Sequence, residues 1–274
     1  MIQYLYLGRV AYDEALLLQE ELVALRLDGR IDNTLLLLEH PPVLTLGRNA
    51  NRANILASDQ LLVSRGVTLH EINRGGDVTF HGPGQLIGYP IFDLRSLTTA
   101  TGNRLGPVDF VRQMEEALIR LCGLYGVRAG RIAGLTGVWC GLSSSQSSSE
   151  TVPPAGPERK IGAIGIHVAR GITSHGFAFN VATDLDFFRL INPCGITDRP
   201  VTSLKREVAN AAELPDLASI SHQAASQFGQ VFSQPTLTIA SLAHLRAQAA
   251  QDTPLQIPRE VERLHDRRER PLRT

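Results

Sequence analysis

A twelve-residue stretch from Arg74 to Gln85 concentrates the residue types that build ligand sites. It reads Arg-Gly-Gly-Asp-Val-Thr-Phe-His-Gly-Pro-Gly-Gln. Glycine lets the backbone approach a ligand closely and adopt positive φ, while Arg74 supplies a fixed cation and His81 a titratable imidazole. This composition favours a binding loop. A glycine-rich hairpin with a hydrogen-bonded histidine is the simpler alternative for the glycines alone.

Cys194 and Lys160 could act together as a nucleophile and the cation that activates it. Cys194 stands between Pro193 and Gly195, just after a predicted helix, where a sulfur would be accessible and rigidly held. A thiol with a pKa near 8.5 is mostly protonated at neutral pH, so it needs a neighbour that lowers this pKa. A lysine at about 4 Å supplies roughly 4 kcal/mol at an effective dielectric of about 20, and about 2 kcal/mol is sufficient.

The composition singles out Lys160 for this role. Of the 27 basic residues only two are lysines, Lys160 and Lys205, and the rest are arginines. A lysine retained among arginines suggests a group that must exchange a proton, which a guanidinium does not do. The alternative is that Lys160 is a solvated cation at the start of a strand. If the thiol and the amine interact, they titrate as a coupled pair.

Four motifs occur in the order found in the octanoyltransferases of lipoate biosynthesis. The glycine-rich stretch comes first, followed by Lys-Ile-Gly-Ala-Ile-Gly from Lys160, His-Gly-Phe-Ala-Phe-Asn from His175 and Asn-Pro-Cys-Gly from Asn192. The chain therefore resembles this family, a member of the biotin/lipoate protein ligase superfamily. The resemblance implies the catalytic-domain fold of these ligases, which is similar to class II aminoacyl-tRNA synthetases and consists of a mixed sheet flanked by helices.

The resemblance also implies a reaction and a site. Cys194 would take an octanoyl group from octanoyl-acyl carrier protein as a thioester and pass it to a lysine of a lipoyl domain, in 2-oxoacid dehydrogenase complexes or glycine cleavage H protein. Lys160 would lower the pKa of Cys194 and act as general acid and base. The implied substrate-binding residues are Arg74, Gly75, Gly76, Asp77, Val78, Thr79, Phe80, His81, Ala163, Ile164, Gly165, Gly176, Phe177 and Ala178.

Two other functions stay open on the same scaffold. An ATP-dependent lipoate or biotin ligase also has a glycine-rich loop, but it activates a free acid as an adenylate and needs no nucleophilic cysteine. A catalytically inactive binding module is the second alternative. His40 and His81 are expected to face the cleft, yet neither has the partner spacing of a zinc site, so we expect no metal and no cofactor.

The overall composition excludes several classes of protein. Acidic and basic residues balance at 27 each in 274 residues, so no global field favours nucleic acid or a membrane surface. The first residues show no basic region followed by an apolar one, so we expect no signal peptide, and the sequence has no run of about 20 apolar residues. Three cysteines without a Cys-x-x-Cys pair predict reduced thiols, with Cys122 and Cys140 as core residues. We expect a soluble cytoplasmic protein.

The elements that must position these residues form an α+β pattern. Residues 33–39 favour a strand buried on both faces, although so short an apolar run could also be helical. Further strands are predicted at 67–72, 77–80 and 86–92, a hairpin at 160–169 and 172–181, and helices at 10–30, 107–126, 184–191, 217–232 and 239–250.

The predicted domain organisation has two parts. Residues 1–235 are expected to form the catalytic domain, and residues 236–274 a C-terminal extension that is helical and then frayed. A serine- and proline-rich segment at 142–158 is predicted to be disordered. We interpret it as an insertion rather than a lid, because it has no aromatic residue and, apart from Leu142 and Val152, no large apolar side chain with which to seal a pocket.

Overall fold

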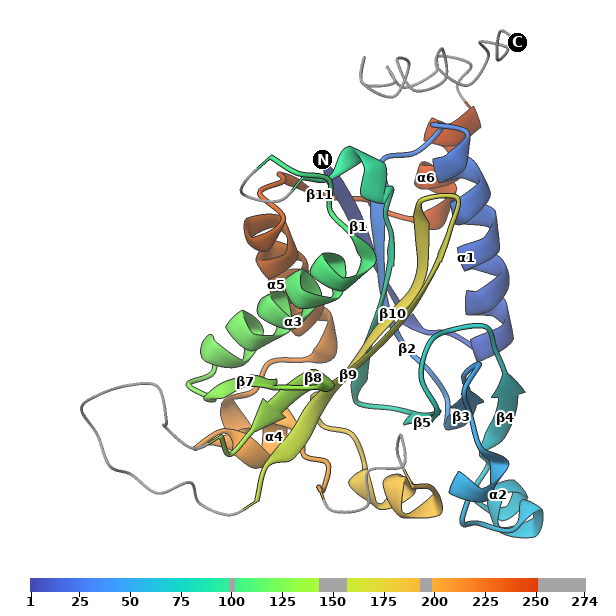
Figure 1. Ribbon diagram of the computed structural model, residues 1–274, viewed down its shortest axis with the longest axis vertical. Coiled ribbons are helices and arrows are strands. Elements are labelled where there is room, and N and C mark those ends of the chain that lie inside the picture. The colour runs from blue at the N-terminus through green and yellow to red at the C-terminus, as the bar shows by residue number, and fades with distance from the viewer. Residues whose placement is uncertain (99–101, 143–156, 193–198, 251–274) are drawn as a thin grey trace, which may run out of the picture.

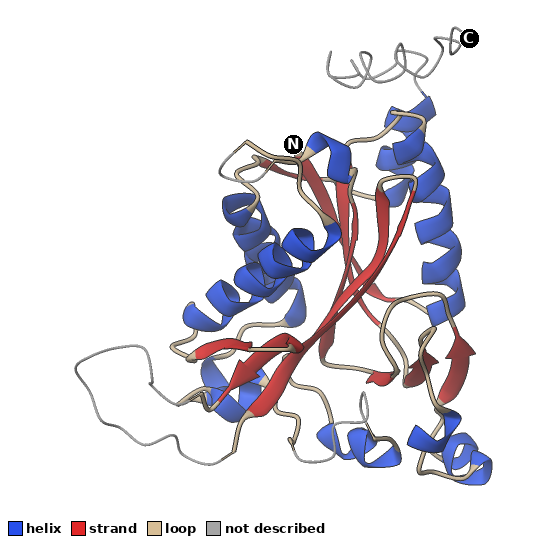
Figure 2. Cartoon of the chain, in the orientation of Figure 1, coloured by secondary structure: helices blue, strands red, loops and turns tan. Residues whose placement is uncertain are grey.

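The computed structural model describes residues 1–98, 102–142, 157–192 and 199–250. Within this part of the chain, a large mixed sheet has the strand order β11-β1-β2-β6-β10-β9-β8-β7 (Figure 2). β1 is parallel to β2 and β11, and all other neighbours are antiparallel. The strands are β1 (Ile2–Arg9), β2 (Asn33–Glu39), β6 (Gln85–Ile91), β7 (Ala129–Ile132), β8 (Leu135–Cys140), β9 (Arg159–Ala169), β10 (Ile172–Asn180) and β11 (Thr236–Thr238).

A second, smaller sheet carries the glycine-rich loop. Its strands are β3 (Val43–Leu46), β4 (Thr68–Glu71) and β5 (Val78–His81), in the order β4-β3-β5. The apolar residues of this sheet pack with those of a short 3₁₀ helix, Leu185–Leu190, in a core cluster of their own. The glycine-rich loop is therefore supported on a platform separate from the strands that face it.

Helices cover both faces of the large sheet (Figure 1). α1 and α6 share one hydrophobic cluster, and α3 and α5 share another on the opposite face. The helices are α1 (Tyr12–Leu27), α2 (Asp59–Ser64), α3 (Pro107–Gly123), α4 (Leu204–Glu207), α5 (Leu217–Val231) and α6 (Leu242–Ala250).

The four consecutive leucines of β2 are divided between the two faces of the large sheet. Leu35 and Leu37 pack into the cluster under α3 and α5, whereas Leu36 and Leu38 pack into the cluster under α1. All four are fully buried. Because side chains alternate across a strand, a strand covered on both sides must be apolar at every position.

The predicted mixed sheet flanked by helices is confirmed, as are the hairpin and the long helices. The short helix predicted at 184–191 is present as a 3₁₀ helix, Leu185–Leu190, and the Asp184 side chain caps it by accepting from the backbone N–H of Asp186. β11 was not predicted. Its three residues are exposed and too few to establish a pattern, and pairing with β1 is what makes them a strand.

Two predicted segments are only partly described. Residues 143–156 of the predicted insertion and 251–274 of the C-terminal extension lie outside the described residues. Residues 236–250 of that extension form β11 and α6 and pack on the large sheet. In the described ranges, none of the helices combines the length and the apolar character required to cross a bilayer.

Docking of α6 predicts a stability effect at Leu245, which is fully buried in the cluster shared with α1. Leu245→Ala should lower the free energy of unfolding by about 2–5 kcal/mol, because it removes buried methyl groups and leaves a cavity. The control is Leu237→Ala on β11, whose side chain is 42% exposed and should cost far less. Urea unfolding measures both, and equal midpoints in the two variants would contradict the packing.

Candidate active site

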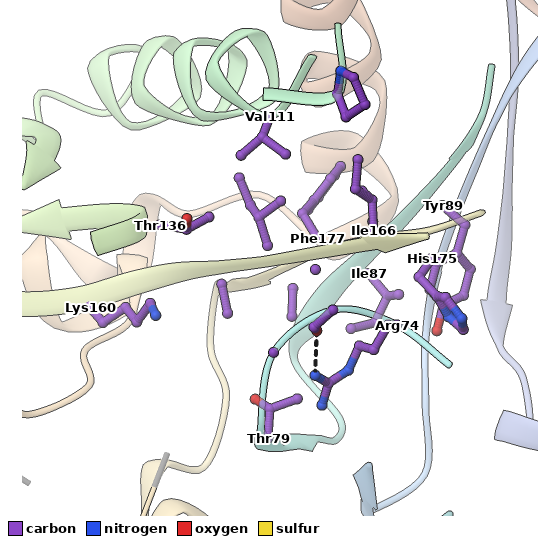
Figure 3. Close-up of a pocket in the computed structure, with 18 of the residues that line it drawn as sticks. Arg74, Thr79, Ile87, Tyr89, Val111, Thr136, Lys160, Ile166, His175 and Phe177 are labelled. Carbon is purple, nitrogen blue, oxygen red and sulfur yellow. Dashed lines mark hydrogen bonds between the residues drawn. The ribbon is translucent and has the colours of Figure 1, made fainter. Parts of the chain in front are cut away.

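A cavity of about 540 Å³ lies between the glycine-rich loop, the β9–β10 hairpin and the N-terminal part of α3 (Figure 3). Its volume falls in the range of about 300–1,000 Å³ that is typical of small-molecule sites. Twelve of the predicted site residues line it: Arg74, Gly75, Gly76, Thr79, His81, Lys160, Ala163, Ile164, Gly165, Gly176, Phe177 and Ala178. The structure thus brings the glycine-rich loop and the β9–β10 hairpin, which are far apart in sequence, to one cavity.

Three residues of the predicted set do not line this cavity: Asp77, Val78 and Phe80. Val78 and Phe80 are buried in the core of the small sheet, because β5 turns alternate side chains to its two faces. Asp77 accepts hydrogen bonds from the backbone of Asn51 and the side chain of Asn54. These residues support the loop instead of forming the cavity wall.

The cavity wraps around an unpaired stretch of the β9 edge. β8 pairs with β9 only as far as Gly162, and the next backbone contact on that edge is made by the N–H of Gly75 to the carbonyl of Ile166, at 3.2 Å. The edge between these points is open to the cavity. A Cβ on Gly165 would come within 2.8 Å of the carbonyl oxygen of Gly75, so the close approach of loop and strand requires glycine there.

The two faces of β9 give the cavity two kinds of wall. Ile164, Ile166 and Phe177 pack with the cluster under α3, where Val111 also lines the cavity. On the other face lie the polar residues of the glycine-rich loop and of α1, among them Arg74. Figure 3 shows the apolar group above the β9 ribbon and Arg74 below it. The site therefore combines a long apolar wall with a polar, cationic end.

Arg74 is held by the backbone around it. Its Nη2 donates to the carbonyl and to the hydroxyl of Thr45, both at 2.8 Å, and its Nη1 donates to the carbonyl of Gly75 at 3.0 Å (Figure 3). Arg74 is 8% exposed. The guanidinium thereby fixes the glycine-rich loop against β3 and places a positive charge at the cavity wall.

The hydrogen bonds of Gln85 determine the tautomer of His81. The amide nitrogen of Gln85 donates to Asn180 Oδ1 at 2.8 Å and to a backbone carbonyl, so its oxygen accepts from His81 Nδ1–H at 2.9 Å. His81 Nε2 then faces the hydroxyl of Thr45 as an acceptor, at 3.4 Å. Burial, with the nearby charges of His40 and Arg74, lowers the pKa of His81 to about 3.

His40 was expected to face the cleft, but it is fully buried and does not line the cavity. Its Nδ1–H donates to the carbonyl of Val10 at 2.7 Å, and its Nε2 accepts from the hydroxyl of Tyr89 at 2.8 Å. Burial lowers the pKa of His40 to about 4. His40 therefore orients Tyr89, which does reach the cavity.

Tyr12 and His175 complete the polar end, and neither was predicted as a site residue. Burial raises the pKa of Tyr12 to about 12. His175 has a φ of 55°, and its backbone N–H donates to the Gln19 side chain at 2.7 Å. Its ring contacts Asn73 Oδ1 at 2.7 Å, and burial lowers its pKa to about 4. His175 is the first residue of the third motif, so that motif could have identified it as a site residue.

Lys160 lines the cavity away from the end occupied by Tyr89 and His175 (Figure 3). Its Nζ lies 5.0 Å from the centre of the Trp139 ring. Its backbone N–H donates to the carbonyl of Pro200, and its carbonyl accepts from the N–H of Thr202, both at 2.9 Å. Cys194 lies outside the described residues. The chain that follows it is thus tied to the backbone of Lys160.

The other two cysteines are core residues, as predicted. Cys122 and Cys140 are buried, and burial raises the pKa of Cys140 to about 12 and that of Cys122 well above its usual range. Such thiols are not nucleophiles near neutral pH. Among the residues that the structure describes, no group of three or more His, Cys, Asp or Glu side chains is arranged to hold a metal ion.

The remaining lining residues were missed because sequence patterns give them structural roles. They are Ile87, Pro107, Val108, Val111, Arg112, Gly134, Leu135, Thr136 and Ile166. Val111, for example, fits the apolar stripe of an amphipathic helix. Only the gap in pairing at the β9 edge turns that stripe into a cavity wall.

The three buried histidines predict a loss of stability in acid. His40, His81 and His175 have folded pKa values of about 4, 3 and 4, below the ordinary value of about 6.5. The unfolded chain therefore binds protons that the folded protein does not, and the free energy of unfolding falls as the pH drops below about 6.5. The limiting slope is about 1.4 kcal/mol per pH unit for each histidine. Urea unfolding between about pH 7.5 and 5.5 measures this slope, and NMR titration showing these rings protonating near pH 6.5 would contradict it.

Comparison with known proteins agrees with this architecture. The family model for the lipoyl protein ligase A/B catalytic domain matches residues 11–228. An octanoyltransferase of Acidobacterium capsulatum is 54% identical over 252 residues, covering 91% of this chain and 98% of that protein. Another, of Koribacter versatilis, is 49% identical over 266 residues, covering 97% and 98%.

The fold agrees as well. The structure of a bipartite lipoate protein ligase from Thermoplasma acidophilum matches with a TM-score of 0.61 at 17% identity, covering 91% of each chain. This likeness confirms the predicted lipoate protein ligase fold. Together with the extensive identity to octanoyltransferases, it shows that the chain belongs to the lipoyl protein ligase A/B catalytic domain family and, within that family, to the octanoyltransferases.

Proposed function

We propose that this acyltransferase works in two half-reactions through Cys194, with octanoyl-acyl carrier protein as donor and a lipoyl-domain lysine as acceptor. The observation that carries the proposal is the position of Lys160. It lines a cavity with a long apolar wall, and its backbone holds residues 200–202, which follow Cys194 in the chain. The acceptors would be the lipoyl domains of 2-oxoacid dehydrogenase complexes and glycine cleavage H protein.

In the first half-reaction, the Cys194 thiolate attacks the carbonyl carbon of the donor thioester. The bond between that carbon and the phosphopantetheine sulfur breaks, and the leaving thiolate takes a proton from the Lys160 ammonium. The product is an octanoyl thioester on Cys194 and a neutral Lys160. A positive charge near the sulfur favours the thiolate before attack, and this is the reason a lysine suits the position.

In the second half-reaction, the ε-amine of the acceptor lysine attacks the octanoyl thioester. Lys160, now neutral, accepts a proton from that amine as the amide bond forms. The carbon–sulfur bond then breaks and Cys194 leaves as a thiolate beside the regenerated ammonium. One lysine thus serves as acid in the first step and as base in the second, provided that the acceptor lysine has already lost one proton to solvent and attacks as the neutral amine.

The apolar wall suits the octanoyl chain. Val111, Ile164, Ile166 and Phe177 line one side of the cavity. Each methylene group buried there would contribute about 0.8 kcal/mol. At the polar end, Arg74 belongs to the glycine-rich loop, which the motif resemblance assigns to substrate binding. The apolar wall would therefore favour an acyl chain without polar groups.

The acyl-enzyme can be observed directly. Incubation with octanoyl-acyl carrier protein, without acceptor, should add one octanoyl group to Cys194, since Cys122 and Cys140 are buried with raised pKa values. Intact mass and peptide mapping identify the adduct, and free octanoate with ATP should leave none. An adduct on another cysteine, or transfer that survives in Cys194→Ala, would refute the assignment.

Lys160→Arg separates charge from proton transfer, because a guanidinium keeps the charge but does not give up its proton. Acylation of Cys194 should survive in part, while transfer to the lipoyl-domain amine should fall by about 10²–10⁴. Single-turnover kinetics of each half-reaction measure the two rates separately. Lys205→Arg, at an exposed position, is the matched control. An unimpaired transfer step in Lys160→Arg would mean that the base lies elsewhere.

A further inference from the structure

We propose that Gly137, held by the buried carboxylate of Glu115, positions the side chain of Lys160. The inference rests on the proposed catalytic role of Lys160 and adds two residues that act through it. Neither residue has a role in the motif resemblance. Gly137 lies on β8 next to the strand that carries Lys160, and Glu115 lies on α3.

A shift in register between β8 and β9 sets the direction of the Lys160 side chain. Trp139 on β8 pairs with Lys160 on β9, but the next pair is Val138 with Gly162. Ile161 is therefore the extra residue of a β-bulge beside Lys160. Bulges bend a strand and redirect the neighbouring side chains, and they are common next to active sites.

The stem of Lys160 occupies the space that a side chain at position 137 would fill. A Cβ on Gly137 would lie 2.7 Å from Cε of Lys160 and 2.6 Å from the carbonyl oxygen of Gly162. Gly137 also has a φ of 125°, a conformation that residues with a side chain rarely adopt. Glycine is needed here both for the backbone conformation and for the lysine.

Trp139 lies on the same side of the sheet as Lys160, because directly paired residues project to the same face. Its ring is fully buried, and Nζ of Lys160 lies 5.0 Å from its centre. At this distance the ammonium is attracted to the ring face. The bare backbone at Gly137 and the indole together define where the ammonium sits.

Glu115 fixes the glycine. Its side chain is fully buried, and its Oε1 accepts from the N–H of Gly137 at 2.9 Å. Its Oε2 accepts from Arg112 at 2.7 Å and from Arg131 at 3.0 Å. These bonds compensate the buried charge, so the carboxylate is a rigid anchor for the backbone of Gly137. Without it, a buried N–H would lose its acceptor.

Lysine NMR tests the placement without relying on activity. The chain has two lysines and one tryptophan, so ¹³C-lysine labelling gives two Cε–Hε signals, and exposed Lys205 is the internal reference. Hε of Lys160 should be shifted upfield by the Trp139 ring. In Gly137→Ala this signal should move towards that of Lys205, and amine transfer should fall at least ten-fold.

The matched control is Gly126→Ala. Gly126 also has positive φ, at 69°, but a Cβ there meets no atom within 4 Å. Alanine is less strained at this φ than at 125°, and the contact with Lys160 is absent, so Gly126→Ala tests a positive φ alone, and the Lys160 signal and the transfer rate should stay as in the parent. An unchanged Lys160 signal in Gly137→Ala would overturn the inference. A displaced signal with normal transfer would support the placement and refute the catalytic role of Lys160 instead.

The role of Glu115 in holding Gly137 is tested with the same NMR signal and the same transfer rate. Glu115→Ala should displace the Lys160 signal and slow transfer, and Glu115→Gln, which retains an acceptor for Gly137, should restore both in part. Arg131→Gln removes an ion pair but leaves the Gly137 bond, so the Lys160 signal should stay in place. A displaced signal in Arg131→Gln equal to that in Glu115→Ala, or none in Glu115→Ala, would overturn the role of the carboxylate.

Discussion

One run of buried hydrogen bonds joins the small sheet to the large one and ends on the backbone of Lys160. It passes from Arg74 through the hydroxyl of Thr45 to His81, then through two side-chain amides to the carbonyl of Thr202. The N–H of Thr202 completes it by donating to the Lys160 carbonyl. The two ends of the cavity are thus parts of one polar structure.

These hydrogen bonds constrain the orientation of each side chain that takes part in them. Gln85 and Asn180, the two amides, each have one orientation that satisfies their neighbours, and this fixes the neutral tautomer of His81. A buried network that is only half satisfied is more costly than an apolar core. The distance between the cationic loop and Lys160 is therefore set by the fold before any substrate enters, which favours a preformed site over one assembled by the ligand.

The sequence predicted the parts of the molecule whose local chemistry is unusual. The glycine-rich loop and Lys160 stand out by type, and the leucines of β2 by their continuity. Asp77, Val78 and Phe80 were predicted as substrate-binding because a motif names consecutive residues, whereas a strand sends alternate side chains to opposite faces. The alternation of side chains along the predicted strand would have placed Val78 and Phe80 on the opposite face from Thr79.

Other features depend on contacts between distant segments. Glu115 fits an ordinary charged position of an amphipathic helix, and only its bond to Gly137 gives it another role. β11 is too short and exposed to be a strand without β1 beside it. The open edge of β9 results from where β8 ends and the loop at Gly75 begins, which is a property of the assembled sheet. Patterns within a single segment contain none of this information.

The position of β11 has a consequence for how the chain is made. Among the described strands of the large sheet, β1 is made before its neighbours, yet its outer neighbour β11 is made last. Met1 and Gln234, which hydrogen-bond beside this pair, are separated by 233 positions. During most of synthesis the outer edge of β1 lacks its partner, and unpaired strand edges promote association between chains. The edge at Ile2–Tyr4, which pairs with Thr236–Thr238, is therefore open to association with other chains until β11 has been made, and a truncation before Thr236 would leave it permanently unpaired.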